Sequence, residues 1–151
     1  MNARLPKNKT LAAWLALLGG QLGLHRLYLF GPRDLWAWVH PAIAAVGWYG
    51  VERVRMHGQD DHLAWLLVPL LGFVLAATAL TAIYYGLMSP EKWNALHNPA
   101  VPDAGIGNTN WLTIGAVVFS LLFGTIALMS SIVFSFQRYF EYQVEEAKKI
   151  S

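Results

Sequence analysis

Four long apolar stretches, separated by short segments that hold nearly all of the charge, constrain this chain more than any other feature. They cover about residues 10–30, 35–51, 63–88 and 111–136. As helices they would be about 31, 26, 39 and 39 Å long, against a hydrocarbon core of about 30 Å. They do not alternate polar and apolar residues as the strands of a membrane barrel do. We therefore expect an all-α integral membrane protein with four transmembrane helices, arranged as two hairpins.

The composition agrees with this fold class and argues against several functions. Of the 151 residues, 56% are hydrophobic and 13% are charged, whereas soluble domains carry about 25% charged residues. A formal net charge of +2 is too small to favour a nucleic-acid partner. The sequence has no cysteine, no nucleophile elbow, no phosphate loop, no dinucleotide fingerprint and no zinc-protease motif. We expect a protein that is not an enzyme, with no catalytic residues, no cofactor and no metal.

The distribution of Lys and Arg predicts an orientation. Eight of them lie in the amino-terminal segment, the loop after residue 51 and the carboxy-terminal tail, whereas loops 31–34 and 89–110 hold one each. The positive-inside rule then places both termini in the cytoplasm. The predicted units are residues 1–62, a hairpin with its cytoplasmic loop, and residues 63–151, a hairpin with outer loop 89–110 and a cytoplasmic tail. Compactness and the lack of a eukaryotic sorting signal favour a bacterial inner membrane.

The densest local motif lies in the first hairpin. It reads Gly20-Gln-Leu-Gly23-Leu-His25-Arg26-Leu-Tyr28-Leu29. This string resembles the signature of the TM-two domain, a two-transmembrane hairpin, and the resemblance covers about residues 7–56. The family has Phe where Leu27 stands, and Gly directly after the Tyr-Leu pair. Glu52 stands where the family has Asp after the Trp of its second helix. The resemblance implies a divergent member of a family without a settled activity.

The glycines and the charge of this motif each have two interpretations. Gly19 and Gly23 lie on one helix face, which Gly20 widens, so another helix can approach closely. This face either packs on the second span or docks a partner protein. Arg26 is the only formal charge inside the four stretches. It either extends to the lipid phosphates or makes a fixed contact with Asp34, as His25 also could.

Two further sites carry polar groups of functional type. His40 and Pro41 interrupt the second stretch, and a histidine at membrane depth is a candidate for proton or ion transport. The segment 57–62 contains metal-ligand types, but the structural alternative is that Gly58 ends one helix and Asp60 or Asp61 caps the next.

The carboxy-terminal half offers a helix start and small-residue faces. Ser89 and Pro90 are typical of a short helix start, and residues 137–149 can continue the last helix. Small residues at helical spacing in the third and fourth stretches favour packing between helices. The sequence shows no convincing internal repeat.

We therefore expect a non-enzymatic, multi-pass membrane protein of the TM-two type that acts as a helix-packing and interaction module. Its expected partners are the lipid bilayer, a second copy of the chain and other membrane proteins, with no nucleic acid. The residues assigned to the motif and to helix packing are Gly19, Gly20, Gly23, His25, Arg26, Tyr28 and Glu52. The alternative function is a small transporter or channel that uses His25, Arg26 and His40.

Overall fold

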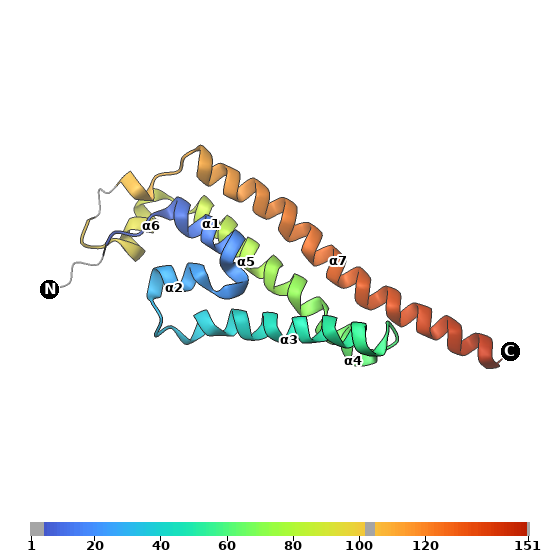
Figure 1. The fold of residues 1–151 in the computed structure, drawn as a ribbon. Coiled ribbons are helices and arrows are strands. Elements are labelled where there is room, and N and C mark those ends of the chain that lie inside the picture. The colour runs from blue at the N-terminus through green and yellow to red at the C-terminus, as the bar shows by residue number, and fades with distance from the viewer. Residues whose placement is uncertain (1–4, 102–104, 151) are drawn as a thin grey trace.

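The computed structural model describes residues 5–101 and 105–150, and every regular element in these ranges is helical. Its helices are α1 (Lys9–Gly19), η1 (Gly20–Leu22), α2 (Leu24–Phe30), α3 (Leu35–His57), α4 (His62–Leu67), α5 (Pro69–Leu87), α6 (Pro90–His97), η2 (Gly105–Gly107) and α7 (Trp111–Ile150). The long helices α3, α5 and α7 run side by side along the molecule, and α1 packs against both α5 and α7 at one end (Figure 1). The all-helical prediction is confirmed.

Two segments are long and apolar enough to cross a membrane, namely His62–Leu87 and Gly105–Ile150. Of the four predicted membrane-spanning helices, two therefore meet this criterion. The helix α3 has 23 residues, or about 34 Å, but it is less apolar because it contains His40 and ends in charged residues. It runs through Pro41 and extends six residues beyond the predicted stretch, to His57.

The prediction of one spanning helix over residues 10–30 is wrong. The helix α1 ends at Gly19 after 11 residues, and α2 has only seven, so they are about 16 and 10 Å long and neither spans a bilayer. Between them Gly23 has φ +71° and ψ +15°, a left-handed conformation that ends helices and that glycine adopts at little cost. The glycines expected to form a packing face therefore also break the helix.

The second short helix returns to the end where the first began, so α1 and α2 form a tight hairpin (Figure 1). The backbone nitrogen of Asn8 donates to the Tyr28 hydroxyl at 2.8 Å, which joins the start of α1 to the end of α2. This fold-back removes one crossing from the predicted topology.

The predicted topology placed both termini on one side of the membrane, whereas the described terminal segments lie at opposite ends of the molecule. The backbone nitrogen of Lys7 donates to Asn98 Oδ1 at 2.6 Å, and Lys9 Nζ donates to the Met88 carbonyl at 2.9 Å. Residues 7–9 thus lie against the loop that was predicted on the opposite side. The end of α7 lies at the far end of the molecule (Figure 1).

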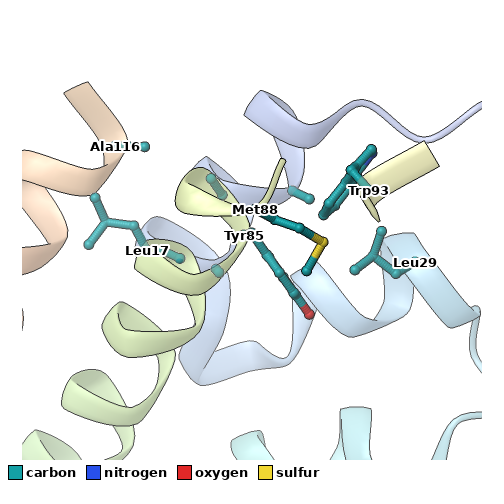
Figure 2. Close-up of a cluster of buried hydrophobic side chains, with 10 residues drawn as sticks. Leu17, Leu29, Tyr85, Met88, Trp93 and Ala116 are labelled. Atoms are coloured by element: carbon teal, nitrogen blue, oxygen red, sulfur yellow. The ribbon is translucent and has the colours of Figure 1, made fainter. Parts of the chain in front are cut away.

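The predicted first and second hairpins share one hydrophobic core. Its members come from α1, α2, α5, α6, α7 and the segment between α5 and α6: Ala12, Ala13, Ala16, Leu17, Leu29, Ala82, Tyr85, Met88, Trp93 and Ala116. Figure 2 shows Tyr85 of α5 and Met88, which follows α5, beside Trp93 and Leu29, with Ala116 facing Leu17 on the other side. The alanines of α1 are fully buried, which allows α1 to lie close to both α5 and α7.

Candidate functional site

The motif glycines are used for packing within the chain. A Cβ on Gly23 would collide with the carbonyl oxygen of Ala37 in α3, and a Cβ on Gly20 would collide with Thr78 in α5. A Cβ on Gly19 would meet the side chain of Leu24 within the hairpin. The interpretation as a packing face for the second span is confirmed for Gly23. Ala37, Thr78 and Leu24 therefore fill the groove that a partner protein would need.

Of the two interpretations of Arg26, the structure has the fixed contact with Asp34. Arg26 Nε donates to Asp34 Oδ2 at 2.6 Å, and Asp34 Oδ1 accepts from the backbone nitrogen of Trp36 at 3.2 Å. Asp34 is thus the N-cap of α3 as well as the ion-pair partner of α2. Its hydrogen bond to Arg26 holds the pKa of the Asp34 carboxyl below its usual value. The pair fixes the turn that joins the short hairpin to α3.

The same turn occurs a second time, between α3 and α4. Arg53 Nε donates to Asp61 Oδ2 at 2.6 Å, and Arg53 also donates to Asp61 Oδ1 at 3.1 Å. Asp61 accepts from the backbone nitrogen of Leu63 and caps α4, as predicted for Asp60 or Asp61. Gly58 ends α3 as expected. The hydrogen bond to Arg53 lowers the pKa of Asp61.

Two further features make these turns equivalent. Gly31 and Gly58 both have φ +85° and ψ near 180°, a conformation open almost only to glycine. In each turn a tryptophan indole then donates to the carbonyl two residues before the aspartate. Trp38 binds the Pro32 carbonyl at 3.1 Å, and Trp65 binds the Gln59 carbonyl at 2.7 Å.

An internal repeat, missed in the sequence analysis, encodes this equivalence. Seven residues recur at positions 27 later in the chain: Gly20, Gly23, Arg26, Gly31, Asp34, Ala37 and Trp38 correspond to Gly47, Gly50, Arg53, Gly58, Asp61, Ala64 and Trp65. The second pair of glycines also packs closely, because a Cβ on Gly50 would lie 2.6 Å from Leu67 Cβ and one on Gly47 would lie 2.8 Å from Leu71 Cγ. Alignment of the chain with itself at an offset of 27 would have revealed the repeat.

The structure brings two of the predicted transport residues together. The rings of His25 in α2 and His40 in α3 meet edge to face, with centroids 5.2 Å apart. His40 Nδ1 lies 2.9 Å from the Trp36 carbonyl. His25 is 1% exposed, and its Nδ1 has no hydrogen-bond partner among the described residues. The Tyr85 ring lies 6.2 Å from the His25 ring.

Tyr28 and Glu52, the other two assigned residues, lie at different places. Tyr28 binds Asn8 at the mouth of the hairpin, and Lys7 Nζ lies 4.7 Å from its ring centroid. Glu52 is half-buried on α3 and pairs with Arg55 at 2.7 Å. Glu52 therefore belongs to no common site with the motif histidine and arginine.

A buried polar cluster at the hairpin mouth was not predicted. Lys9 is fully buried, and its Nζ donates to the Met88 carbonyl and, at 2.6 Å, to Thr109 Oγ1. Burial lowers the pKa of the Lys9 amine, and the Glu91 carboxylate opposes this shift. Trp93 donates from its indole to the Lys7 carbonyl at 2.8 Å. These bonds attach the amino-terminal segment to α6, whose Ser89 cap and Pro90 start are as predicted.

Within the described ranges, no group of three or more His, Cys, Asp or Glu side chains is arranged to hold a metal ion. In the segment considered for metal binding, Asp61 is engaged by Arg53, and the His62 ring packs on Trp65 and Tyr142 at 4.4 and 4.7 Å between centroids. Comparison with protein-family models, with curated proteins and with solved structures finds no match to this chain. The TM-two resemblance therefore stays a prediction.

Proposed function

We propose that the chain is a multi-pass integral membrane protein. The supporting observation is that its two most apolar helical windows are only 33% and 17% buried. A core helix of a soluble protein would be mostly covered by its own fold. Large side chains along α7, such as Leu122, Ile126 and Met129, are about half exposed. In water they would form an apolar surface much larger than soluble monomers carry, whereas a bilayer solvates it.

The proposed topology has three crossings, by α3, by α4 with α5, and by α7. The α1–α2 hairpin enters and leaves at one end, which is tolerated when non-helical backbone is buried in protein. This arrangement places the ends of the chain on opposite sides. Apart from Arg26, which pairs with Asp34, the described Lys and Arg residues then divide four against five: Lys7, Lys9, Arg33 and Lys92 at one end and Arg53, Arg55, Arg138, Lys148 and Lys149 at the other. The positive-inside rule no longer selects an orientation, so the bacterial inner membrane remains a proposal.

Within the membrane, the proposed role is that of a non-enzymatic interaction module whose contact surface lies on α7. This helix has 40 residues and is about 60 Å long, twice the hydrocarbon thickness. Past its contact with α5 it carries Phe136, Phe140 and Val144 at four-residue spacing, which are 59%, 60% and 53% exposed. The opposite side of this part of α7 packs on α4 through Ser135 and Tyr142. The Phe136 and Phe140 rings stack with centroids 6.4 Å apart. We name these three residues the α7 stripe.

A second copy of the chain is the proposed partner for the α7 stripe. Residues at this spacing form one helix face, and a two-fold contact between two such faces would bury both stripes at once. The observation that carries this proposal is that an apolar stripe continues past the part of α7 that packs on α5. The motif glycines do not serve this purpose because their groove is filled from within the chain.

The test is the oligomeric state of the full chain in a mild detergent, measured by native mass spectrometry. We expect a dimer for the unchanged protein and a monomer for the Phe140→Gln/Val144→Gln variant. Glu146→Gln, which changes the same helix off the stripe, is the matched control and should stay dimeric. A monomeric unchanged protein, or a double variant that dimerises as well as the control, would refute the α7 contact. If the protein stays soluble after cell lysis without detergent, the membrane proposal itself fails.

A small transporter or channel remains the second candidate, and the His25–His40 contact is the observation that favours it. These rings, with Tyr85, place three titratable side chains in succession between α2, α3 and α5. The test is proton flux into liposomes that contain the purified protein. The transport hypothesis expects His40→Ala to reduce this flux to the level of empty vesicles, and flux equal to that of empty vesicles for the unchanged protein would refute it.

A further inference from the structure

Two adjoining cavities lie at the end of the molecule where the α1–α2 hairpin opens. The larger has a volume of about 440 Å³ and lies between the amino-terminal segment, the end of α2 and α6 with the residues that follow it. The smaller has a volume of about 290 Å³ and lies along residues 27–33. Lys7, Leu29 and Phe30 line both cavities, so the two are neighbours. The larger cavity is within the range typical of small-ligand sites.

The larger cavity is an apolar chamber with few polar groups free to bind a ligand. Leu5, Phe30 and Leu96 contribute much of its wall, and they are 82%, 51% and 59% exposed. Asn98 also lines it, but its side chain already binds both backbone polar groups of Lys7. Such a wall suits a hydrocarbon chain rather than a polar molecule.

The smaller cavity is cationic. Lys7 and Arg33 both line it, and among the described residues no carboxylate lies within ion-pair distance of either side chain. By contrast, Arg26 and Arg53, on the helices before the two equivalent turns, each hold an aspartate at 2.6 Å. Within ranges 5–101 and 105–150, the one contact of Lys7 Nζ is with the face of the Tyr28 ring, at 4.7 Å from its centroid. A phosphate or carboxylate between the two cations would supply the missing charge partner.

The position of the cavities also fits a lipid. Helices α3 and α7 both begin at this end of the molecule (Figure 1), and Trp36 and Trp111 in their first turns are 65% and 85% exposed. Exposed tryptophans are typical of the headgroup level of a bilayer. An apolar chamber and a cationic cavity at that level match the two parts of an amphiphile.

We propose that these cavities form a binding site for an anionic phospholipid. The phosphate lies between Lys7 and Arg33, and one acyl chain enters the chamber lined by Leu5, Phe30 and Leu96. This inference rests on the proposed membrane location. It predicts selection by headgroup charge, which a helix bundle without a built site does not require.

The test uses the full chain purified in a neutral detergent and mixed with equal amounts of phosphatidylglycerol and phosphatidylcholine. Native mass spectrometry then counts the lipid that stays bound. We expect the anionic lipid to be retained at least tenfold more than the zwitterionic one. The Lys7→Gln/Arg33→Gln variant should lose this preference, whereas Lys92→Gln should keep it. Lys92 is a matched control because it is a cation at the same end that lines neither cavity.

Three outcomes would overturn the proposal. One is equal retention of both lipids by the unchanged protein, and another is an undiminished preference in the double variant. The third is that inorganic phosphate at millimolar concentration displaces the lipid completely, which would indicate a phosphate site without a chamber. Filling the chamber with Leu96→Trp should lower lipid retention while leaving the thermal unfolding of the lipid-free protein nearly unchanged. If the protein needs detergent for solubility but fails these lipid-binding tests, the membrane proposal stands and the lipid site is refuted.

Discussion

Substitution of Gly23 by alanine tests the close approach of the α1–α2 hairpin to α3. Gly23 has φ +71° and ψ +15°, and a side chain in this left-handed region costs about 1–2 kcal/mol. Its new Cβ would also collide with the Ala37 carbonyl oxygen. Because that obstacle is backbone within a helix, it cannot rotate away, and overpacking of this kind costs about 1–3 kcal/mol. We therefore expect Gly23→Ala to destabilise the fold by about 2–5 kcal/mol in total.

Two other glycines provide matched controls for this prediction. Gly31 also has a positive φ, but a Cβ there would meet nothing within 4 Å, so Gly31→Ala measures backbone strain alone, about 1–3 kcal/mol. Gly115 lies inside α7, where a Cβ would make an ordinary contact with Trp14 at 3.7 Å. Alanine is favoured over glycine in a helix interior, so Gly115→Ala should stabilise the protein by about 0.5–1 kcal/mol.

The measurement is reversible unfolding in mixed micelles, followed by tryptophan fluorescence, for the unchanged protein and the three variants. The reasoning requires Gly23→Ala to be the least stable and Gly115→Ala the most stable. A Gly23→Ala variant as stable as the unchanged protein would mean that the hairpin does not approach α3 as described. Equal losses for Gly23→Ala and Gly31→Ala would mean that strain, and not the contact with Ala37, explains the effect.

Two further predictions concern the polar contacts. Asn98→Ala should destabilise the protein by about 1–3 kcal/mol, because it leaves the partly buried backbone nitrogen of Lys7 without its partner. The Lys7 carbonyl keeps its bond from the Trp93 indole. A change within error in micelle unfolding would contradict the role of that cluster. Asp61 has a pKa below its usual value of 3.8 because it binds Arg53. Its contribution to stability is therefore complete above pH 3.8 and is lost as the pH falls through the lower folded pKa. Acid titration should show this loss in the unchanged protein and a shallower slope below pH 3.8 in Asp61→Asn.

Local signals in the sequence predicted local structure well. The helix caps at Asp61 and Ser89 follow from residue type and position, because a short side-chain oxygen before a helix binds its free backbone N–H groups. A contact of Arg26 or His25 with Asp34 was one of two interpretations of the charge in the motif, and the sequence did not decide between it and extension of Arg26 to the lipid phosphates. The long apolar stretches likewise predicted helices, and the described chain contains no other regular element.

Topology was harder to predict because the chain reverses direction near Gly23. This reversal moves the start of α1 to the end of the molecule opposite to the one predicted. Treating residues 10–30 as one crossing put Lys7 and Lys9 with the cytoplasmic cations, and the count of eight against two then looked decisive. The fold-back transfers these cations to the other end, beside α6. The positive-inside rule gives a correct orientation only when the number of membrane crossings is correct. Hydropathy alone does not reveal that a long apolar stretch reverses direction.

The internal repeat shows which residues decide between a broken and a continuous helix. Gly20 and Gly23 border or end a helix, whereas their equivalents Gly47 and Gly50 lie inside α3 without interrupting it. The two repeats differ just before the first glycine, where Gly19 stands in one and Val46 in the other. Each glycine costs a helix about 0.5–1 kcal/mol relative to alanine, so three within five residues weaken it more than two do. The additional Gly19 therefore gives a physical reason why one sequence pattern forms a fold-back in the first repeat and a continuous helix in the second.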